Sequence, residues 1–528
     1  MKQKDQTFLT SFKKYFKFDT FDAIFKKEII GGLSTFLAMA YILAVNPSIV
    51  GASPINPGDN QQFASQYQGG LFLATAIATV FASMFMGLYA RVPLALAPGM
   101  GLNAFFAYTV AQQVGFDSAL TITMLSGILY FFVVMSPLRT KISSIIPTNL
   151  KISIGAGIGF FIAYLGLQNS RIIIKDPSNA LVSTLGDFGN PLVIVGLVVL
   201  VLALVLHYSK ITGSIIISML IGAIILIILI LTKSIKGVDP NTINPVSVGY
   251  SGFSTFDDVI VAGWKGFANA NMWKNPITYI GILSFFYMDF FDTTGTLIVM
   301  DKTLNLSKKD PNWMEKANFV DAVSTIIGST IGATTVTSFV ESTVGVSAGA
   351  KTGLSTIVTA LCFASSIALW PVIQIFMPIN VDGIQYQPIT GPILVLIGTL
   401  MITQIRHFEW EIIIDIPTLF ITIIMMMLTN SIAYGLSFGI ITFVILNGFL
   451  GLMQYFLMHF SKNETKRKSC KKIVNSIEIL TIKDEGVKVK TREFYYLKRI
   501  DIWLYLIFLI AIIYIILQTG ITYHNWFL

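Results

Sequence analysis

Apolar stretches of 18 or more residues recur along nearly the whole chain, and they constrain its fold more than any other feature of the sequence. Each stretch is long enough to cross a hydrocarbon layer of about 30 Å as a helix. Only 12% of the 528 residues are charged, where a soluble globular protein has about a quarter, and the mean hydropathy is +0.72. The sequence therefore excludes a soluble enzyme and predicts one all-α, polytopic membrane domain.

The predicted membrane spans follow these apolar stretches. They lie near 31–50, 70–90, 96–112, 118–137, 152–168, 191–207, 213–232, 277–300, 318–335, 338–350, 353–377 and 389–405. The stretch 412–457 is long enough for one crossing with a re-entrant turn or for two crossings, and a last apolar stretch lies at 502–520. One crossing at 412–457 gives about fourteen spans, and two give about fifteen.

Basic residues between the spans indicate which side of the membrane each connection faces. With residues 1–28 as a basic, amphipathic, cytoplasmic lead-in, most Lys and Arg residues of the connections fall inside. Arg171, Lys175 and the lysines of the long connection 233–276 are exceptions. Charge also favours two crossings at 412–457, which puts the following basic tail inside. The net charge of +8 is thus explained by topology and lipid headgroups, and we expect no nucleic-acid partner.

Residues typical of hydrolytic, redox or metal chemistry form no recognisable motif. Cys362 and Cys470 lie far apart and have neither a metal-ligand spacing nor a disulfide framework. The four histidines form no HExxH or Cys/His cluster, and the sequence has no GxxxxGK phosphate loop. We therefore expect no enzymatic activity, no cofactor and no metal. An intramembrane enzyme or a receptor would need a nucleophile–base pair, metal ligands or a sizeable soluble domain.

Two spans have an unusual composition and occupy comparable places in the two halves of the chain. The first reads VPLALAPGMGLNAFFAYTV (92–110), and the second reads GATTVTSFVESTVGVSAGAKTG (332–353). Each begins with a Pro/Gly-rich or β-branched stretch that favours extended backbone and continues as a short helix. Paired broken segments indicate the central site of a secondary transporter. Two Gly-rich helices that pack closely are the alternative.

Carboxylates inside predicted spans each need a partner or a function, because they cost roughly 2.5 to 3.5 kcal/mol at the helix centre. Glu341 lies where the second broken segment turns from extended backbone into helix, near free backbone N–H groups. Four polar residues of the run FFYMDFFDTTGTL are predicted to share one helical face: Asp289, Asp292, Thr293 and Thr296. This face must point at protein or at a cavity.

A packing network is the alternative for each of these polar residues, because a buried carboxyl can be protonated and satisfied by neighbouring hydroxyls. For Asp289 and Glu341 the pattern favours function. For Asp292, and for Asn103 in the first broken segment, the two interpretations have equal support. Asp321, nearer a predicted span end and beside Asn318, is expected to be solvated or structural.

Four motifs, in this order along the chain, resemble one known family. They are GGLSTFLAMAYILAVNP (31–47), APGMGLNAFF (97–106), FFDTTGTL (290–297) and TSFVESTVGVSAGAKTG (337–353). The chain resembles the AzgA-like branch of the nucleobase cation symporter-2 (nucleobase-ascorbate transporter) family, whose members are adenine, guanine and hypoxanthine permeases. The resemblance runs over most of 20–457. It implies a protein of the cell membrane that imports purine nucleobases by proton symport, with elevator-type alternating access.

The resemblance also implies two inverted repeats of seven segments, with broken third and tenth segments, a core domain and a gate domain. The first repeat would span 29–232, with core segments at 31–137 and gate segments at 152–232, and the second 277–457, with core segments at 277–377 and gate segments at 389–457. A connecting loop at 233–276 would separate them, and a basic tail (458–500) and a C-terminal membrane helix (501–528) would follow. Relatives of this fold suggest a homodimer.

By motif, the resemblance carries over Asn103, the acidic pair Asp289 and Asp292, and Glu341 as functional residues. Our own hypothesis is that Asp289 and Glu341 bind the base, Asn103 fixes its orientation, and Ser338 and Gly101 add contacts. Asp289 or Glu341 is expected to couple the proton, with Asp292 tuning it. Two carboxyls, an amide and backbone N–H groups suit a planar, uncharged purine edged with donors and acceptors. The alternative is a transporter of the same fold for uracil, xanthine or an anion, although an anion site should contain a basic residue or bare helix N-termini. The sequence leaves open which purine is preferred and whether the coupling ion is H⁺ or Na⁺.

Overall fold

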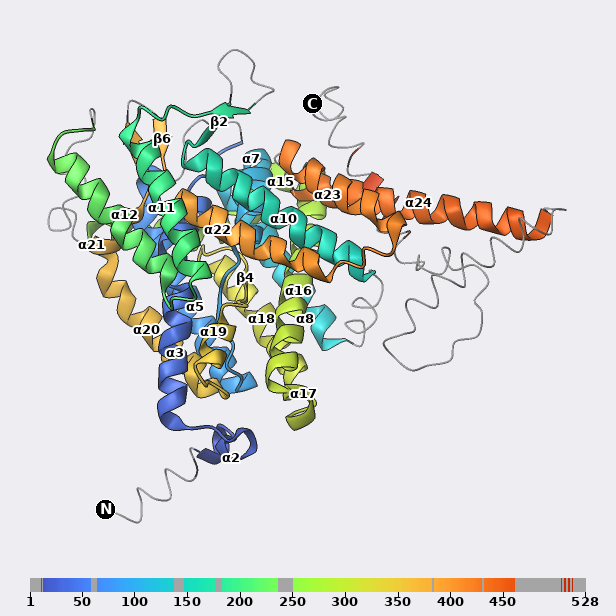
Figure 1. The fold of residues 1–528 in the computed structure, drawn as a ribbon, viewed down its shortest axis with the longest axis horizontal. Coiled ribbons are helices and arrows are strands. Elements are labelled where there is room, and N and C mark those ends of the chain that lie inside the picture. Colours follow the sequence, from blue (N-terminus) through green and yellow to red (C-terminus); the bar gives the residue numbers. More distant parts are fainter. Residues whose placement is uncertain are drawn as a thin grey trace. The chain divides into compact units, whose positions relative to one another are not determined.

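Helices dominate the computed structural model, as predicted (Figure 1). The structure describes residues 11, 13–57, 64–136, 147–175, 183–235, 250–381, 384–429 and 432–460, with scattered residues between 505 and 515. The chain divides into two compact units. Unit 1 comprises Met1–Pro137 and Ile162–Leu400, and unit 2 comprises Leu138–Phe161 and Met401–Leu528. The predicted basic tail and C-terminal helix lie almost entirely outside the described residues.

The elements follow the predicted order. The first half of the chain contains α2 (Phe18–Phe21), α3 (Phe25–Met39), α4 (Ile42–Val50), α5 (Ala64–Phe85) with the π-helical turn η1 (Met86–Ala90), α6 (Met100–Phe105) with the π-helical turn η2 (Phe106–Val110), α7 (Ala111–Val114), α8 (Phe116–Met135), α10 (Thr148–Asn169), α11 (Pro191–Tyr208) and α12 (Ser214–Leu231). The second half contains η4 (Ser251–Thr255), α14 (Phe256–Lys265), η5 (Gly266–Ala268), α15 (Ala270–Lys274), α16 (Pro276–Leu304), α17 (Leu306–Lys309), α18 (Trp313–Thr330), α19 (Ser342–Ser347), α20 (Gly353–Ser366), η6 (Ile367–Leu369), α21 (Trp370–Ile373), η7 (Gln374–Phe376), α22 (Thr390–Ile402), η8 (Thr403–His407), η9 (Ile413–Asp415), α23 (Ile416–Leu428) and α24 (Ile432–Phe460).

Three antiparallel pairs of three-residue strands complete the described part of the chain. They are β1 (Leu96–Pro98) with β4 (Val336–Ser338), β2 (Ile173–Lys175) with β3 (Ser183–Leu185), and β5 (Ile379–Val381) with β6 (Ile384–Tyr386). The first pair joins the two halves of the chain, whereas each of the other two is a local hairpin.

Nine helical stretches of the described residues are long and apolar enough to cross a membrane. They are Phe25–Val50, Tyr67–Ala90, Phe116–Met135, Thr148–Asn169, Pro191–Tyr208, Ser214–Leu231, Pro276–Asp301, Gly353–Phe376 and Tyr434–Leu452. The prediction of a polytopic helical membrane protein is confirmed. The total of about fourteen segments and their inverted repetition stay predictions.

Asn-Pro pairs begin two of the long helices. The Oδ1 atom of Asn190 accepts a hydrogen bond from the N–H of Leu192 at 2.9 Å, and that of Asn275 accepts one from Ile277 at 3.0 Å. Proline follows each cap at the first helical position, where a missing N–H costs nothing. The two caps define where α11 and α16 start.

The predicted connecting loop 233–276 contains packed helices in its described part. The segment 250–274, made of η4, α14, η5 and α15, lies against α5 and α8. Thr121 of α8 donates a hydrogen bond to the carbonyl of Gly263 at 2.7 Å, and Thr255 accepts one from the N–H of Gly70 at 3.1 Å. This segment is therefore part of the folded body of unit 1.

The apolar stretch 412–457 forms two helices, α23 and α24, within unit 2. They run antiparallel and approach closely at two glycines of α24. A Cβ atom at Gly435 would lie 2.0 Å from Cγ of Met426, and one at Gly439 would lie 2.1 Å from Oγ1 of Thr422. Only α24 is long enough to cross a membrane by itself.

The compact units do not coincide with the predicted core and gate. Unit 1 holds every described segment that the resemblance assigns to the core, but it also holds α11, α12 and α22, which it assigns to the gate. Within unit 1, α18 packs on α8 and α5, and α20 packs on α3 and α5. The division into core and gate stays a prediction.

Candidate functional site

The two broken segments meet inside unit 1 as a short antiparallel pair. Strand β1 pairs with β4 in the register Leu96↔Ser338, Ala97↔Thr337 and Pro98↔Val336. All six residues are buried, and each strand leads into a short helix, α6 or α19. The pairing supplies hydrogen bonds to backbone that no helix satisfies, which a membrane interior requires. The predicted broken segments are confirmed, and two continuous Gly-rich helices are the wrong alternative.

The turn before β4 uses unusual backbone. Gly332 has a φ of 89° and Thr334 a φ of 70°, a left-handed conformation that glycine adopts readily and threonine does not. A Cβ atom at Gly332 would lie 2.2 Å from Cγ1 of Val259, so glycine is also needed there for space. The Thr334 hydroxyl donates to Oδ1 of Asn103, which ties this turn to α6.

Asn103 connects the two broken segments through its amide. Its Nδ2 atom donates to Oδ1 of Asn46 on α4, and its Oδ1 atom accepts from Thr334. Asn46 in turn donates to Oγ1 of Thr75 on α5 at 2.9 Å. Asn103, Asn46, Thr75 and Thr334 are all fully buried. The amide therefore holds four elements of unit 1 together.

Asp289 lies in the middle of α16 and is buried against α18. Its Oδ2 atom accepts a hydrogen bond from Oγ1 of Thr325 at 2.8 Å, and the same hydroxyl lies 2.8 Å from the carbonyl oxygen of Val336 in β4. Its Oδ1 atom is buried without a hydrogen-bond partner in the described structure. The carboxyl thus touches the crossing of the broken segments through Thr325.

Asp321 is also buried, so the expectation of a solvated side chain is wrong. Helix α18 begins at Trp313, five residues before the predicted span, and Asp321 therefore lies in mid-helix. Its Oδ2 atom accepts from Oγ1 of Thr293 on α16 at 2.6 Å, and its Oδ1 atom is buried and unpaired among the residues described. Thr293 also lies 2.9 Å from Oγ1 of Thr337 in β4.

The other two carboxylates of the site are accessible. Glu341 is half-buried at the start of α19, and its Oε1 atom accepts from the hydroxyl of Tyr41 at 3.1 Å. Asp292 is exposed, and its charge interacts with that of Glu341. At about 100° per residue, Asp292 lies about 60° from Asp289 on α16, at the edge of the predicted polar face. The face is therefore split into a buried part and an accessible part.

Ser338 and Gly101 lie at the same crossing. Ser338, at the end of β4, is buried; its hydroxyl donates to Oγ1 of Thr293 at 3.4 Å, and its carbonyl oxygen accepts from Thr296 at 3.4 Å. Gly101 is half-buried in α6, two residues before Asn103. The structure thus places Ser338 in β4, and Gly101 and Glu341 three residues beyond β1 and β4. Asn103 and Asp289 lie within one hydrogen-bonded threonine of β4 or the turn before it, whereas no hydrogen bond joins Asp292 to either strand in the described structure. Each of three of these residues bonds a different threonine: Asp289 bonds Thr325, Ser338 bonds Thr293, and Asn103 bonds Thr334.

Several residues of these networks were not predicted as site residues from the sequence. Tyr41 and Asn46 belong to the motif GGLSTFLAMAYILAVNP, and the signal that points to them is an isolated polar side chain in an apolar span. Asp321 and Thr325 are spaced i, i+4, which places both on the side of α18 that faces α16.

Comparison with known proteins identifies the family. The model described as the Permease family, with the short name xanthine/uracil permease, matches residues 26–438, more than three quarters of the chain. The chain belongs to this family. Its similarity to a Bacillus subtilis protein, "Guanine/hypoxanthine permease PbuG", is 34% identity over 82% of this chain and 93% of the relative. It is 30% identical to "Adenine permease AdeP" of Escherichia coli over 82% of this chain and 90% of the relative.

A solved structure shares the fold of this permease. The transmembrane domain of the cyanobacterial bicarbonate transporter BicA aligns with a TM-score of 0.51 and 13% identity, over 78% of this chain and 96% of that domain. The resemblance found in the motifs is confirmed at the level of the family. The chain is a multi-pass membrane permease, and its curated relatives are transporters and not enzymes.

Proposed function

We propose that this permease is a secondary transporter that imports purine nucleobases by proton symport. The observation that carries the proposal is the chemistry of the β1–β4 crossing: four carboxyl groups gather there, and none of them forms an ion pair within the described structure. Relatives named for guanine, hypoxanthine and adenine transport support a purine substrate. A site rich in hydrogen-bond acceptors suits a neutral base with several N–H donors. The same carboxyl groups disfavour the binding of an anion.

The accessible carboxylates are the groups that we assign to the base. Glu341, held by Tyr41, accepts hydrogen bonds from ring N–H groups, and Asp292 lies beside it. Ser338 and Gly101, one from each broken segment, offer backbone groups to the base. Asn103, whose amide is bound by Asn46 and Thr334, acts by fixing the orientation of those segments. Asp289 completes the predicted set from the buried side.

The buried carboxyls are the groups that we assign to the proton. An isolated ionised carboxylate is very costly in a medium of low dielectric constant, and two that face each other cost more. Asp289 and Asp321 approach from facing helices without a counter-charge, so a proton on one of them removes much of this cost. One co-transported charge is worth about 2.3 kcal/mol per 100 mV, which is roughly fiftyfold accumulation of a neutral base. Asp292 and Glu341 tune this titration and are alternative carriers.

The proposal extends to topology and movement. The N-terminus is cytoplasmic, and the protein lies in the cell membrane as the homodimer that relatives of its fold suggest. The two broken segments are hydrogen-bonded within one compact unit, which supports their movement as one body in an elevator-type cycle.

Uptake of labelled hypoxanthine into proteoliposomes with an imposed proton gradient tests the proposal. We expect uphill uptake that a protonophore abolishes and that guanine or adenine, but not bicarbonate, inhibits. Asp289→Asn and Glu341→Gln should abolish accumulation, whereas Asp258→Asn, an exposed acid of α14, should leave it unchanged. Inhibition by uracil or xanthine alone would assign another nucleobase. Wild-type accumulation in either site variant would refute the assigned roles.

A further inference from the structure

A face of exposed lysines lies at one end of unit 1, and the proposed transport site does not use it. Its members are Lys13, Lys14, Lys26, Lys27, Lys308 and Lys309, which we call the lysine face. They come from the N-terminal segment, from the start of α3 and from α17, so residues about 300 positions apart in the sequence contribute to it. The exposed acids nearby are fewer: Asp19, Asp22 and Glu315.

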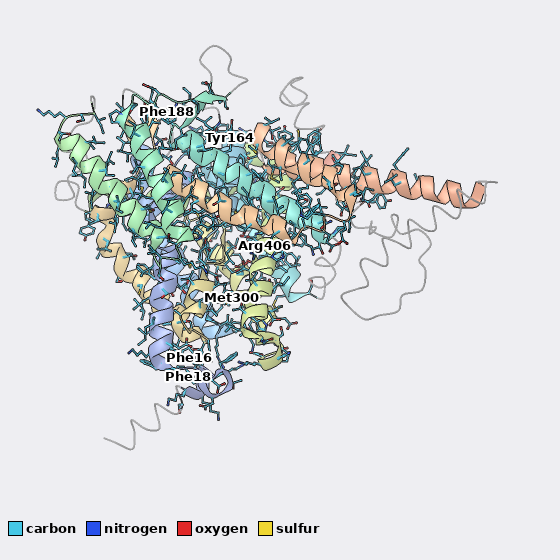
Figure 2. The ribbon with its side chains drawn as sticks, viewed as in Figure 1. Phe16, Phe18, Tyr164, Phe188, Met300 and Arg406 are labelled. Atoms are coloured by element: carbon cyan, nitrogen blue, oxygen red, sulfur yellow. The ribbon has the colours of Figure 1, made fainter. Side chains whose placement is uncertain are left out.

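The N-terminal segment is docked firmly enough to hold its part of the face in place. Phe16 and Phe18 are buried, each 4% exposed, and pack with Leu354 of α20 (Figure 2). The hydroxyl of Tyr15 donates to the carbonyl of Leu88 at 2.8 Å, and the guanidinium of Arg91 lies 4.1 Å from the centre of the Tyr15 ring. The described part of the predicted amphipathic lead-in is thus packed on unit 1.

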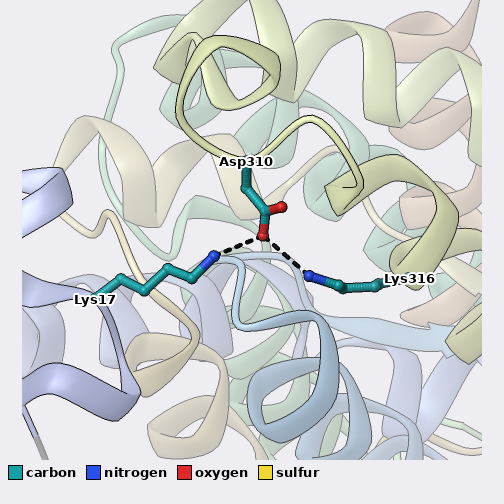
Figure 3. Close-up of polar contacts among 3 residues, drawn as sticks. All are labelled: Lys17, Asp310 and Lys316. Carbon is teal, nitrogen blue, oxygen red and sulfur yellow. Dashed lines mark hydrogen bonds and ion pairs between the residues drawn. The ribbon is translucent and has the colours of Figure 1, made fainter.

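Asp310 joins the two contributing segments. Its Oδ2 atom lies 2.7 Å from Nζ of Lys17 and 3.2 Å from Nζ of Lys316 (Figure 3). Close by, the ammonium of Lys309 lies 4.8 Å from the centre of the Phe21 ring. One carboxylate therefore meets two ammonium groups, so this contact leaves the surrounding surface with an excess of positive charge.

Apolar stripes end at the lysine face. Ile30, Leu33 and Leu37 are exposed along one side of α3, and Ile24 and Phe25, both 53% exposed, stand immediately before Lys26 and Lys27. Exposed apolar side chains on a membrane helix face lipid, and lysines at the end of such a stripe lie at the level of the headgroups. The lysine face is therefore at the height where lipid phosphates are found.

We propose that the lysine face binds the phosphate headgroups of anionic lipids, such as phosphatidylglycerol, and that the docked N-terminal segment fixes this binding site to unit 1. Each lysine near a membrane surface raises the affinity for anionic lipid about fivefold, so several lysines on one face together favour stable binding. The inference does not rest on the transported substrate. Bound lipid would stabilise unit 1, because it bridges the N-terminal segment and α17.

Thermal unfolding of the full chain in lipid nanodiscs tests this site. Discs of phosphatidylcholine are compared with discs that also contain phosphatidylglycerol, and unfolding is followed by tryptophan fluorescence. We expect phosphatidylglycerol to raise the unfolding midpoint, and the rise to shrink as NaCl is added. The combined variant Lys13→Gln, Lys14→Gln, Lys26→Gln, Lys308→Gln should lose most of the rise and, by native mass spectrometry, at least tenfold in phosphatidylglycerol affinity.

A matched control removes the same number of lysines elsewhere. Lys175, Lys233, Lys265 and Lys274 are exposed on segments outside the lysine face, and their combined change to Gln should keep the full rise. Changing the four lysines of the face to Arg should keep it as well, since the charge is retained. An undiminished rise in the Gln variant, or an equal loss in the control, would overturn the proposal. Inorganic phosphate added to phosphatidylcholine discs should give no rise; an equal rise there would show a phosphate site and not a lipid site.

Discussion

Asp321 is the residue whose position changes the interpretation of the site most. Like Asp289, it is buried and accepts a hydrogen bond from a threonine hydroxyl that also contacts β4, and neither carboxyl has an ion-pair partner among the described residues. If these acids carry the proton, Asp321→Asn should lower proton-driven accumulation of hypoxanthine at least tenfold, while exchange of internal for external hypoxanthine continues. Exchange moves no net proton, so it separates coupling from binding. Equal loss of exchange and accumulation would assign Asp321 to substrate binding or to folding.

The carboxylate of Glu28, on α3, binds the backbone N–H groups at the start of α20, and we predict that this contact stabilises the protein. The carboxylate is fully buried and accepts from the backbone N–H groups of Lys351 at 2.8 Å, Thr352 at 3.1 Å and Ser355 at 3.2 Å. These include the first free donors of α20. Glu28→Ala leaves buried N–H groups unsatisfied and should destabilise the protein by about 2–3 kcal/mol. A thermal melt in detergent measures this, with Asp257→Ala, a change of an exposed acid on α14, as the neutral comparison.

Individual residues also show how much of the candidate site can be predicted from the sequence. Asp289 and Glu341 are predictable because a carboxylate in an apolar span must have a partner or a function. Asp321 is not, because its burial depends on α18 starting five residues early and packing against α8 and α5. Likewise, the bond of Tyr41 to Glu341 joins residues 300 positions apart, and no local pattern contains it.

Among the elements, α19 shows what the small residues of the second broken segment achieve. A Cβ atom at Gly345 would lie 2.1 Å from Oγ1 of Thr35 and 2.5 Å from the carbonyl oxygen of Gly31, so α19 and α3 touch backbone to backbone. The extended stretch and short helix were predictable from β-branched residues followed by glycines. The contact of α19 with α3 could not be predicted, because the spacing of small residues does not indicate which helix they pack against.

The contact of α19 with α3 predicts a contrast between two glycines. Gly345→Ala must push α19, which carries Glu341 at its start, away from α3, and should lower both the unfolding midpoint and the affinity for substrate. Gly295→Ala on α16 meets no atom within 4 Å and should be neutral or stabilise the protein by up to about 1 kcal/mol. Melting and binding of the two variants, measured together, check this. Equal unfolding midpoints and affinities in the two variants would mean that α19 can shift away from α3 without loss of stability or binding.

The link between the N-terminal segment and the α17–α18 connection predicts a pH effect. Although partial burial disfavours the charged form, hydrogen bonds from Lys17 and Lys316 hold the pKa of Asp310 below its ordinary value of 3.8. A lowered pKa means that the stabilisation is present above pH 3.8 and is lost as the pH falls through the value in the folded protein. Asp310→Asn should therefore lower the free energy of unfolding by about 1 kcal/mol or less at pH 7 and by less at high salt. It should have no effect at a pH below the pKa of Asp310 in the folded protein. A wild-type–variant difference that persists at low pH would contradict this account.

For the whole molecule, the decisive question is which parts move together. Within unit 1 the two broken segments pair with each other, the N-terminal segment packs on α20, and the segment 250–274 packs on α5 and α8. The proposed elevator cycle requires these parts to travel as one body against α11 and α12. Three pairs of positions bring Cβ atoms within disulfide distance, 3.6–3.7 Å apart: Leu120 with Gly263, Val199 with Gly222, and Leu37 with Gly213. Gly213 has a φ of 78°, so a cysteine there strains the backbone, and the reduced variant is the reference for the third pair.

Cross-linking these pairs, in a chain without Cys362 and Cys470, separates the two kinds of movement. Oxidised Leu120→Cys/Gly263→Cys joins two parts of the proposed core, and oxidised Val199→Cys/Gly222→Cys joins two helices of the proposed gate. Both should keep transport. Oxidised Leu37→Cys/Gly213→Cys joins α3 to the start of α12, and it should stop hypoxanthine uptake until a reductant restores it. Undiminished uptake with this last bridge closed would mean that α3 and α12 move together, so the core and gate boundaries implied by the family resemblance would have to be redrawn.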